Sequence, residues 1–270
     1  MANIVSGSTV LITGASSGIG WALAFEFAKD AKNIILVARR KEKLDSLAAE
    51  IMKLYPTTYV TTIACDLRST SSMDELLANI QTKKLNVDIL VNNAGHGDFT
   101  LLENAEWNKV ESLINLNLVA PTYLTVKLLP SMVKNRKGGI MNISSTLGLF
   151  SIPGLATYTG SKHFMSGLTE SLIMELDGKG IQVTHVCPGP VETDFEGAAR
   201  ARDADIIGKL SLISAKQCAE ESYAGFIKGK PRIVPGKIMG MLTTLLILLP
   251  RCIHRMVFKK LTNEIRAMSK

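Results

Sequence analysis

The sequence predicts an α/β fold, in which one doubly wound parallel sheet of about seven strands carries helices on both faces. Short apolar runs alternate with helical stretches along most of the chain. The runs are apolar at successive positions, as in strands buried on both faces. A glycine-rich turn also joins the first apolar run directly to a helix. With 270 residues, the chain fits a single domain of this class.

Each expected strand is an apolar run of ordinary strand length, at residues 8–13, 33–38, 58–64, 87–91, 139–144, 180–186 and 232–234. The expected helices occupy the stretches between them, at residues 21–28, 41–54, 70–82, 105–117, 120–135, 156–178 and 215–228. We interpret the first of these helices as amphipathic. Ligands of such a sheet bind beyond the carboxyl ends of its strands, so residues that follow strands are the first candidates for a site.

Composition excludes several classes of protein. Hydrophobic residues make up 46% of the chain and charged residues 20%, which excludes a disordered chain. The four cysteines are scattered without metal-ligand spacing, so we expect reduced, mostly buried thiols and no metal site. The first strand begins almost at the N-terminus, which leaves no room for a leader peptide. We therefore expect a cytoplasmic protein, or one on the cytosolic face of a membrane.

The turn after the first strand has the residues of a phosphate-binding loop. It reads Thr13-Gly14-Ala15-Ser16-Ser17-Gly18-Ile19-Gly20. Glycines let the backbone approach a pyrophosphate closely, and the unpaired amides of the following helix attract the anion. The glycine spacing is Gly-x-x-x-Gly-x-Gly, which differs from the commoner Gly-x-Gly-x-x-Gly fingerprint.

A serine, a tyrosine and a lysine form the candidate catalytic group. Tyr158 and Lys162 are four residues apart in an expected helix, and therefore share one face of it. An ammonium at Lys162 would lower the pKa of the Tyr158 phenol, so that the phenol acts as acid or base near neutral pH. Ser145 ends a strand and offers a neutral hydroxyl to hold a substrate oxygen. For the pair taken alone, the alternative is a solvated helix face.

Together these motifs resemble the short-chain dehydrogenase/reductase family over residues 7–236. Asn92-Asn93-Ala94-Gly95 resembles its second signature, and Pro188-Gly189 resembles the loop that seats the nicotinamide. The resemblance implies a single Rossmann-type domain whose catalytic residues are Asn117, Ser145, Tyr158 and Lys162. It also implies that the cofactor contacts Gly14, Ser16, Ser17, Gly18, Ile19, Gly20, Arg39, Arg40, Asp66, Leu67, Asn93, Ala94, Gly95, Tyr158, Lys162, Pro188, Gly189, Val191 and Thr193.

The end of the second strand indicates which nicotinamide cofactor is used. A carboxylate there would accept a hydrogen bond from a ribose 2′-hydroxyl and would repel a 2′-phosphate. No acid occurs between Ala31 and Lys41, whereas Arg39 and Arg40 are placed to bind the phosphate. This favours NADP(H); the alternative is that both arginines are solvated loop charges.

The resemblance implies an oxidoreductase that interconverts a ketone and a secondary alcohol, with Tyr158 moving the proton. It is closest to the ketoacyl and hydroxysteroid reductases, which suggests a hydrophobic substrate and a homodimer or homotetramer. The residues of the expected substrate loop, Val191 to Leu212, do not indicate which substrate binds. The alternative function is an NADP(H)-binding redox sensor or scaffold, against which the complete catalytic set argues. Epimerases and dehydratases of similar fold need a longer chain.

We expect two parts in the chain. Residues 1–236 form the dinucleotide-binding and catalytic domain, and residues 237–270 form a C-terminal extension that is first apolar and then basic. No charge occurs from Ile238 to Pro250, and Arg251 to Lys270 then holds six Lys or Arg residues against one acid. Thirteen uncharged residues are too few to span a membrane. Peripheral membrane contact through residues 238–260, an active-site lid and a subunit contact are the three open interpretations. No aromatic residues are interleaved with the basic residues, so we expect no nucleic acid partner.

Overall fold

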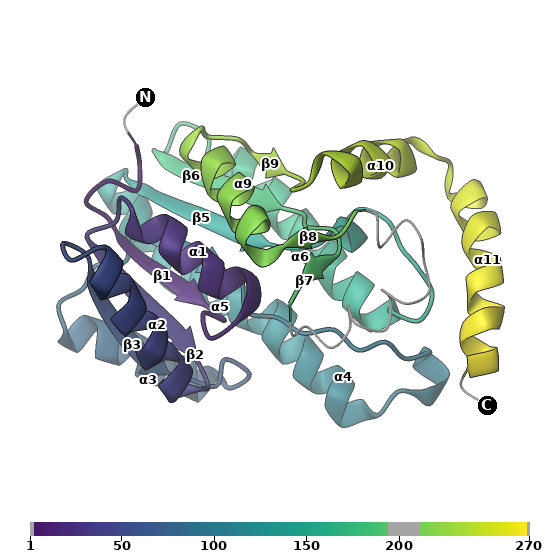
Figure 1. The fold of residues 1–270 in the computed structure, drawn as a ribbon, viewed down its shortest axis with the longest axis horizontal. Helices are drawn as coiled ribbons and strands as arrows, with labels where there is room; N and C mark the ends of the chain where they lie inside the picture. The colour runs from purple at the N-terminus through teal and green to yellow at the C-terminus, as the bar shows by residue number, and fades with distance from the viewer. Residues whose placement is uncertain (1–2, 194–210, 269–270) are drawn as a thin grey trace.

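The computed structural model describes residues 3–193 and 211–268. Its main sheet has seven strands, all parallel, in the order β3-β2-β1-β4-β5-β6-β9 (Figure 1). The strands are β1 (Thr9–Thr13), β2 (Asn33–Ala38), β3 (Tyr59–Ala64), β4 (Ile89–Asn92), β5 (Gly138–Ile143), β6 (Ile181–Val186) and β9 (Arg232–Ile233). The expected doubly wound sheet is confirmed. Strand order reverses between β1 and β4, which is where such sheets bind their ligands.

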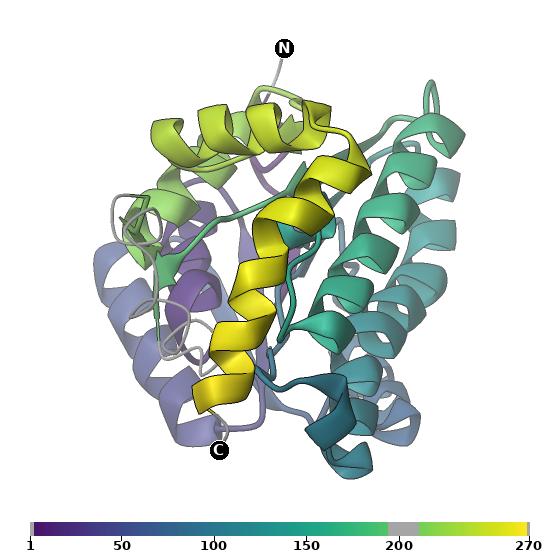
Figure 2. The same cartoon turned by 90° about the vertical axis from the view of Figure 1, so that its right-hand side faces the viewer.

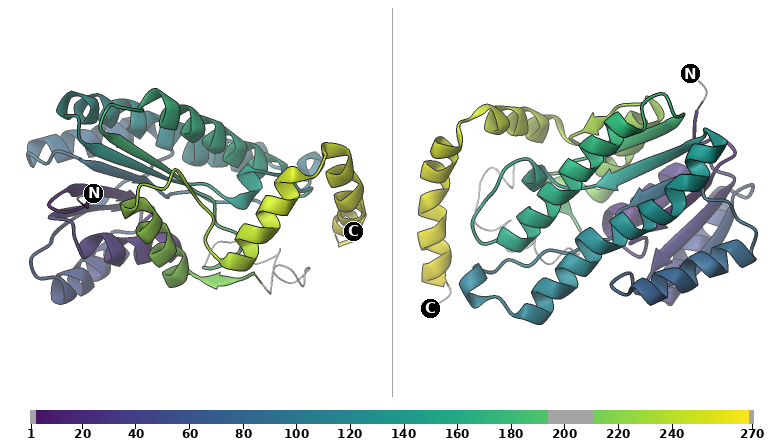
Figure 3. Two further views of the ribbon diagram at one scale, coloured as in Figure 1. Left: turned by 90° about the horizontal axis from the view of Figure 1, so that it is seen from above. Right: turned by 180° about the vertical axis from the view of Figure 1, so that it is seen from behind.

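Helices cover both faces of the sheet, as the two layers in Figure 3 show. The helices are α1 (Gly18–Ala28), α2 (Lys41–Leu54), α3 (Thr70–Thr82), α4 (Trp107–Ile114), α5 (Ala120–Asn135), α6 (Ala156–Glu175), α9 (Ala215–Ile227), α10 (Lys237–Leu248) and α11 (Arg251–Met268). Short turns of helix are η1 (Leu102–Asn104) and η3 (Thr146–Gly148), and β7 (Val191–Glu192) pairs with β8 (Ile213–Ser214).

Side chains of each strand alternate between two hydrophobic cores. Ile12 of β1 packs with Phe27 of α1 and Phe226 of α9 on one face. Leu11, the preceding residue, packs with Leu124 of α5 on the other face. Because both faces are covered, the central strands β1, β2 and β4 are apolar at three or more successive positions, which is the pattern that predicted a parallel sheet.

Helix α1 is not amphipathic, contrary to the sequence-based interpretation. It lies between the sheet and α9, and every residue from Gly18 to Ala28 is buried or half-buried. Packing on two sides removes the need for a polar face. This burial fixes the N-terminal end of α1 firmly at the carboxyl end of β1.

The expected break between helices 105–117 and 120–135 is absent. A single π-helical turn, η2 (Asn115–Val119), connects α4 to α5 without interruption. The wider turn accommodates one extra residue in the helix and is a feature often found at functional sites. It places Asn117, which is 2% exposed, on the inner side of the helix.

The C-terminal helices differ in how they pack. In α10, Met239 and Thr243 are buried against the rest of the domain. Helix α11 turns away and stands beyond the carboxyl ends of the strands (Figures 1 and 2). No single helix in the described part of the chain is long and apolar enough to cross a membrane; Lys237–Leu248 and Arg251–Lys259 meet that criterion only together, with a bend of 116° between them.

Candidate active site

The glycine turn between β1 and α1 is locked to the end of β4 by one threonine. Thr13 Oγ1 donates to the Val91 carbonyl (3.1 Å) and accepts from the amides of Asn93 (2.9 Å) and Ala94 (3.1 Å). In return, Asn93 Nδ2 donates to the carbonyl oxygens of Thr13 (2.9 Å) and Gly14 (3.3 Å). Two of the predicted cofactor segments therefore form one rigid unit across the switch point of the sheet.

Two glycines of this turn have no room for a side chain. Gly14 has φ +68°, and a Cβ there would lie 2.8 Å from the Cα atom of Ala94. A Cβ at Gly20 would lie 2.4 Å from the Gly14 carbonyl oxygen. The Ser17 side chain stands at the N-cap of α1 without capping it, which leaves the first amides of the helix open to a ligand. This cradle fits the pyrophosphate of a dinucleotide.

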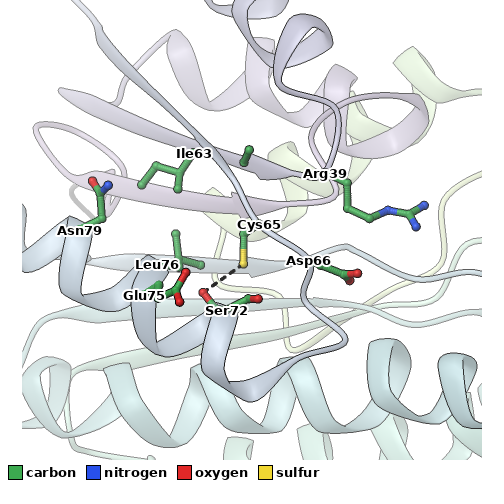
Figure 4. A pocket seen from close by; sticks show the side chains of 9 residues that line it. Arg39, Ile63, Cys65, Asp66, Ser72, Glu75, Leu76 and Asn79 are labelled. Atoms are coloured by element: carbon green, nitrogen blue, oxygen red, sulfur yellow. Dashed lines mark hydrogen bonds between the residues drawn. The ribbon is translucent and has the colours of Figure 1, made fainter.

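Arg39 and Arg40 have different environments. Arg40 donates hydrogen bonds to Ser16 Oγ (2.9 Å) and Ser17 Oγ (2.9 Å), so it holds the glycine turn. Arg39 is exposed and projects away from Cys65, as Figure 4 shows. Of the two arginines, Arg40 is therefore hydrogen-bonded to the glycine turn and Arg39 is not.

Arg39 borders an open groove of about 470 Å³ beside β3 and α3. Its lining is shown in Figure 4 and comprises Arg39, Ile63, Ala64, Cys65, Asp66, Ser72, Glu75, Leu76 and Asn79. Asp66 is paired with Arg68 at 2.5 Å, which lowers the pKa of that carboxyl and holds the loop after β3. Leu67, the next predicted cofactor residue, is 4% exposed and belongs to the core under α5.

The structure brings Ser145, Tyr158 and Lys162 together at the carboxyl end of β5. Ser145 is hydrogen-bonded to the phenol of Tyr158 and accepts a hydrogen bond from the Leu147 amide (3.1 Å). Lys162 Nζ donates to the carbonyl oxygen of Ile143 (3.1 Å) and lies 5.6 Å from the centre of the Tyr158 ring. All three candidate side chains are buried, between 6% and 8% exposed.

Burial dominates the electrostatics of this group. It raises the pKa of Tyr158 to about 12, although the hydrogen bond with Ser145 acts in the opposite direction. Burial also lowers the pKa of Lys162 to about 8. The pKa of the phenol is therefore shifted upward, opposite to the direction predicted from the helical spacing. Loss of hydration disfavours the phenolate more than the hydrogen bond with Ser145 favours it.

The fourth candidate, Asn117, links the helix bearing the π turn to α6, which carries Tyr158 and Lys162. Its Nδ2 donates to the His96 carbonyl (2.9 Å) and to Ser161 Oγ (3.1 Å), and its Oδ1 accepts from the His96 amide (3.1 Å). Ser161 Oγ in turn donates to the Tyr158 carbonyl (2.6 Å). The predicted residue Gly95 is adjacent, since a Cβ there would lie 3.2 Å from Asn117 Oδ1.

The Pro188–Thr193 segment runs from the catalytic group back to the glycine turn. The Pro188 carbonyl accepts from the Thr146 amide (2.9 Å), next to Ser145. A Cβ on Gly18 would lie 3.0 Å from Thr193 Cγ2. One on Gly189 would lie 2.5 Å from Met239 Cγ of α10. Of the remaining predicted residues, Val191 is 5% exposed and Ile19 packs against the core around α1.

Of the expected substrate loop, residues 194–210 lie outside the described residues, including Arg200-Ala201-Arg202-Asp203. At the start of the expected loop, Val191 and Glu192 form β7, which pairs with β8 directly after its end.

A buried polar cluster behind Lys162 was not found from the sequence. Ser166 Oγ donates to the Lys162 carbonyl (2.9 Å) and contacts His185 Nε2 (3.2 Å). His185 Nδ1 faces Glu170 at 3.5 Å, and Glu170 is paired with Arg232 at 2.5 Å. Burial lowers the pKa of His185 to about 4. Only the unusual histidine within a buried strand could have signalled this cluster.

A parallel sheet with a glycine cradle at its switch point and a buried Ser-Tyr-Lys group at its carboxyl edge defines a dinucleotide-dependent oxidoreductase. Residues 8–204 match the family model described as short chain dehydrogenase, and the chain belongs to that family.

Named relatives agree with this placement. The chain is 35% identical over 227 residues to the Drosophila melanogaster protein "Dehydrogenase/reductase SDR family protein 7-like", covering 82% of this chain and 69% of that one. It is 35% identical over 189 residues to the 3-oxoacyl-(acyl-carrier-protein) reductase FabG of Thermotoga maritima, covering 70% and 76% respectively. A short-chain dehydrogenase from Sphingobium yanoikuyae, solved in complex with NADPH, superimposes with a TM-score of 0.77 at 29% identity, over 90% of this chain and 96% of that one.

Proposed function

We propose that this oxidoreductase uses NADP(H) to interconvert a ketone and a secondary alcohol on a hydrophobic substrate. The observation that carries the proposal is the Ser145, Tyr158 and Lys162 group, buried at the same sheet edge as the glycine cradle. Tyr158 acts as the acid or base, Ser145 holds the substrate oxygen, and Asn117 and Lys162 complete the catalytic set.

The chain's own residues fit the cofactor. The cradle of Gly14, Gly18 and Gly20 with the open amides of α1 binds the pyrophosphate. Arg39, with Arg40 beside it, provides the charge that a 2′-phosphate requires, and no carboxylate from β2 opposes it. The Asn93-Ala94-Gly95 and Pro188-Gly189 segments then face the nicotinamide half. The S. yanoikuyae structure, with NADPH on the same fold, supports this assignment.

When bound, NADPH supplies the hydride that reduces the carbonyl carbon. Tyr158 donates the proton to the carbonyl oxygen while Ser145 holds that oxygen by a hydrogen bond. A phenol whose pKa is about 12 is fully protonated at neutral pH, which is the form that donates.

An apolar cluster beside the phenol supports a hydrophobic substrate. Tyr158 packs with Leu113 and Leu155, and Phe99 and Ile152 are partly buried against them. Apolar walls with a few convergent polar groups are typical of small-molecule sites. The name of the T. maritima relative, which specifies a 3-oxoacyl substrate, is consistent with a ketone on an acyl chain.

The same proposal includes a homodimer or homotetramer in the cytoplasm, with peripheral membrane contact through residues 238–260. Cys65, Cys187 and Cys218 are buried free thiols, as in a reducing compartment. Sedimentation of the purified protein measures the oligomeric state; a monomer at all concentrations would contradict this part.

The experiment is a titration with NADPH and NADH, followed by NADPH oxidation with apolar ketones and 3-ketoacyl thioesters. We expect tighter binding of NADPH, and turnover that Tyr158→Phe reduces by roughly 10²- to 10⁴-fold without weakening NADPH binding. The matched control is Tyr59→Phe, an exposed phenol on β3. If the Tyr158→Phe variant turns over at the native rate, Tyr158 is not the group that donates the proton. If the native chain binds NADPH but reduces no ketone, the alternative function as a redox sensor is favoured.

A further inference from the structure

The outer face of α10 is apolar along its whole length. Ile238, Met241, Leu245 and Leu248 are spaced as one helical stripe and are 48%, 63%, 57% and 75% exposed. A helix at the surface of a globular domain normally presents polar residues there. The opposite side is already buried through Met239, so the stripe cannot be the part of α10 that packs on the domain.

Helix α11, which follows α10 after a bend of 116°, adds exposed apolar residues and cations. Met256 and Val257 are 71% and 57% exposed, and the exposed residues Arg251, Arg255 and Lys259 form a row with i, i+4 and i+8 spacing on the same helix. From Ile238 to Asn263 the sequence contains no Asp or Glu. An apolar surface bordered by cations and without a single acid is the composition of segments that lie in a membrane interface.

Position connects this surface to the active site. In Figures 1 and 2, α11 stands beyond the carboxyl ends of the strands, on the side where Tyr158-bearing helix α6 begins. Met239 of α10 also abuts Gly189 in the loop after β6. A planar surface resting against α10 and α11 would therefore lie on the side of the domain to which the carboxyl ends of the strands point.

Three interpretations of this face are a lipid surface, a contact with a second copy of the chain and a lid over the active site. Charge and the direction of the apolar stripe favour the lipid surface. A second copy docked through the same face would bring its own Arg251, Arg255 and Lys259 to this surface, with no acid between Ile238 and Asn263 of either copy to neutralise the added charge. A lid would need to bury the α10 stripe, which points away from the domain. Anionic headgroups neutralise the cations, while the acyl region receives the apolar stripe.

We propose that α10 and α11 dock on an anionic lipid surface, and that the ketone substrate reaches Tyr158 from that surface. The twelve residues of α10 extend about 18 Å, short of the ~30 Å hydrocarbon core, so the helix lies on the bilayer and does not cross it. The docking surface stands on its own; the delivery of substrate rests on the proposed reductase function.

The test is flotation of the full chain with vesicles of phosphatidylcholine alone and with about a third phosphatidylserine. We expect binding to the anionic vesicles that weakens with salt, and much weaker binding to the neutral ones. The double variant Leu245→Asp with Leu248→Asp should lose at least tenfold in vesicle affinity. The matched control, Met52→Asp with Leu54→Asp, changes two exposed apolar residues of α2 and should bind as the native chain does.

A second pair of variants, Arg255→Gln with Lys259→Gln, tests charge without touching the apolar stripe. Each cation near an anionic surface contributes roughly fivefold to affinity, so this pair should reduce the preference for phosphatidylserine by roughly 25-fold. Native binding by this pair would refute the role of charge. If the native chain binds no vesicles, the proposal is overturned. If, in that case, the native chain forms oligomers and the Leu245→Asp with Leu248→Asp variant does not, the apolar face of α10 is a contact with a second copy.

Turnover separates this proposal from the reductase proposal. On a water-soluble ketone without vesicles, the Asp variant should retain native NADPH binding and turnover. If the native chain binds vesicles but reduces no ketone, the docking surface stands and the reductase function fails. If it reduces a vesicle-embedded ketone no faster than the Asp variant does, delivery from the lipid is refuted.

Discussion

Replacement of Gly20 by alanine tests the phosphate cradle directly. The new Cβ would lie 2.4 Å from the Gly14 carbonyl oxygen and 2.4 Å from Asn93 Nδ2, whereas real Cβ atoms essentially never approach other atoms within 3.0 Å. The carbonyl belongs to the backbone, so the turn itself must move. Overpacking of this kind costs about 1–3 kcal/mol, against a gain of about 1 kcal/mol from placing alanine in a helix.

We therefore expect Gly20→Ala to leave the stability of the fold unchanged or to lower it by up to about 2 kcal/mol. Displacement of the turn should cost at least one charge-assisted hydrogen bond to phosphate, which raises the Kd for NADPH by at least about tenfold. Fluorescence titration and thermal unfolding measure the two effects.

The matched control is Gly167→Ala, on an exposed position of α6 where a Cβ would meet no atom within 4 Å. It should stabilise the fold by up to about 1 kcal/mol without changing the Kd for NADPH. If Gly20→Ala behaves like this control in both measurements, the tight approach at Gly20 is not what shapes a phosphate site.

Three further predictions concern charge and protonation. Arg39→Gln should raise the Kd for NADPH by roughly tenfold or more and leave the Kd for NADH nearly unchanged, since only NADPH has the 2′-phosphate. Equal increases in the two Kd values would exclude binding of the 2′-phosphate by Arg39. Because burial lowers the pKa of Lys162 to about 8, kcat/KM should fall as the pH rises above about 8, and a flat profile in that range would exclude a required ammonium. The pKa of His185 falls from 6.5 to about 4 on folding, so stability that is fully present above pH 6.5 should be lost by up to about 3 kcal/mol as the pH falls towards 4. His185→Gln should flatten the unfolding temperature across that window, and an unchanged slope would assign the loss to other groups.

The sheet could be predicted because its signal is local. Each strand of the main sheet is within two residues of its predicted bounds, and the clearest signal comes from the central strands β1, β2 and β4, where burial on both faces makes successive residues apolar. The clustering of Ser145, Tyr158 and Lys162 could also be predicted, because Tyr158 and Lys162 share a helix face and Ser145 follows a strand. The sequence order of these motifs carried the family resemblance, which the match over residues 8–204 confirms.

The features that could not be predicted depend on tertiary contacts. The π turn leaves two helical segments on either side of Asn117, so periodicity alone suggests a break there. The pKa of Tyr158 depends on how completely the phenol is buried, which spacing along a helix does not reveal. Likewise, adjacent arginines look equivalent in the sequence, and only the hydrogen bonds of Arg40 to Ser16 and Ser17 separate their roles.

The contact between Met239 and Gly189 has a thermodynamic consequence. One helix, α10, carries both the apolar stripe and the side chain that closes against the predicted nicotinamide loop. Two ligands that bias one structural element are linked, and the linkage is reciprocal. By whatever factor a lipid surface changes the affinity for NADPH, NADPH changes the affinity for that surface by the same factor. Occupancy of the cofactor site would then help to set how much of this protein resides on a membrane.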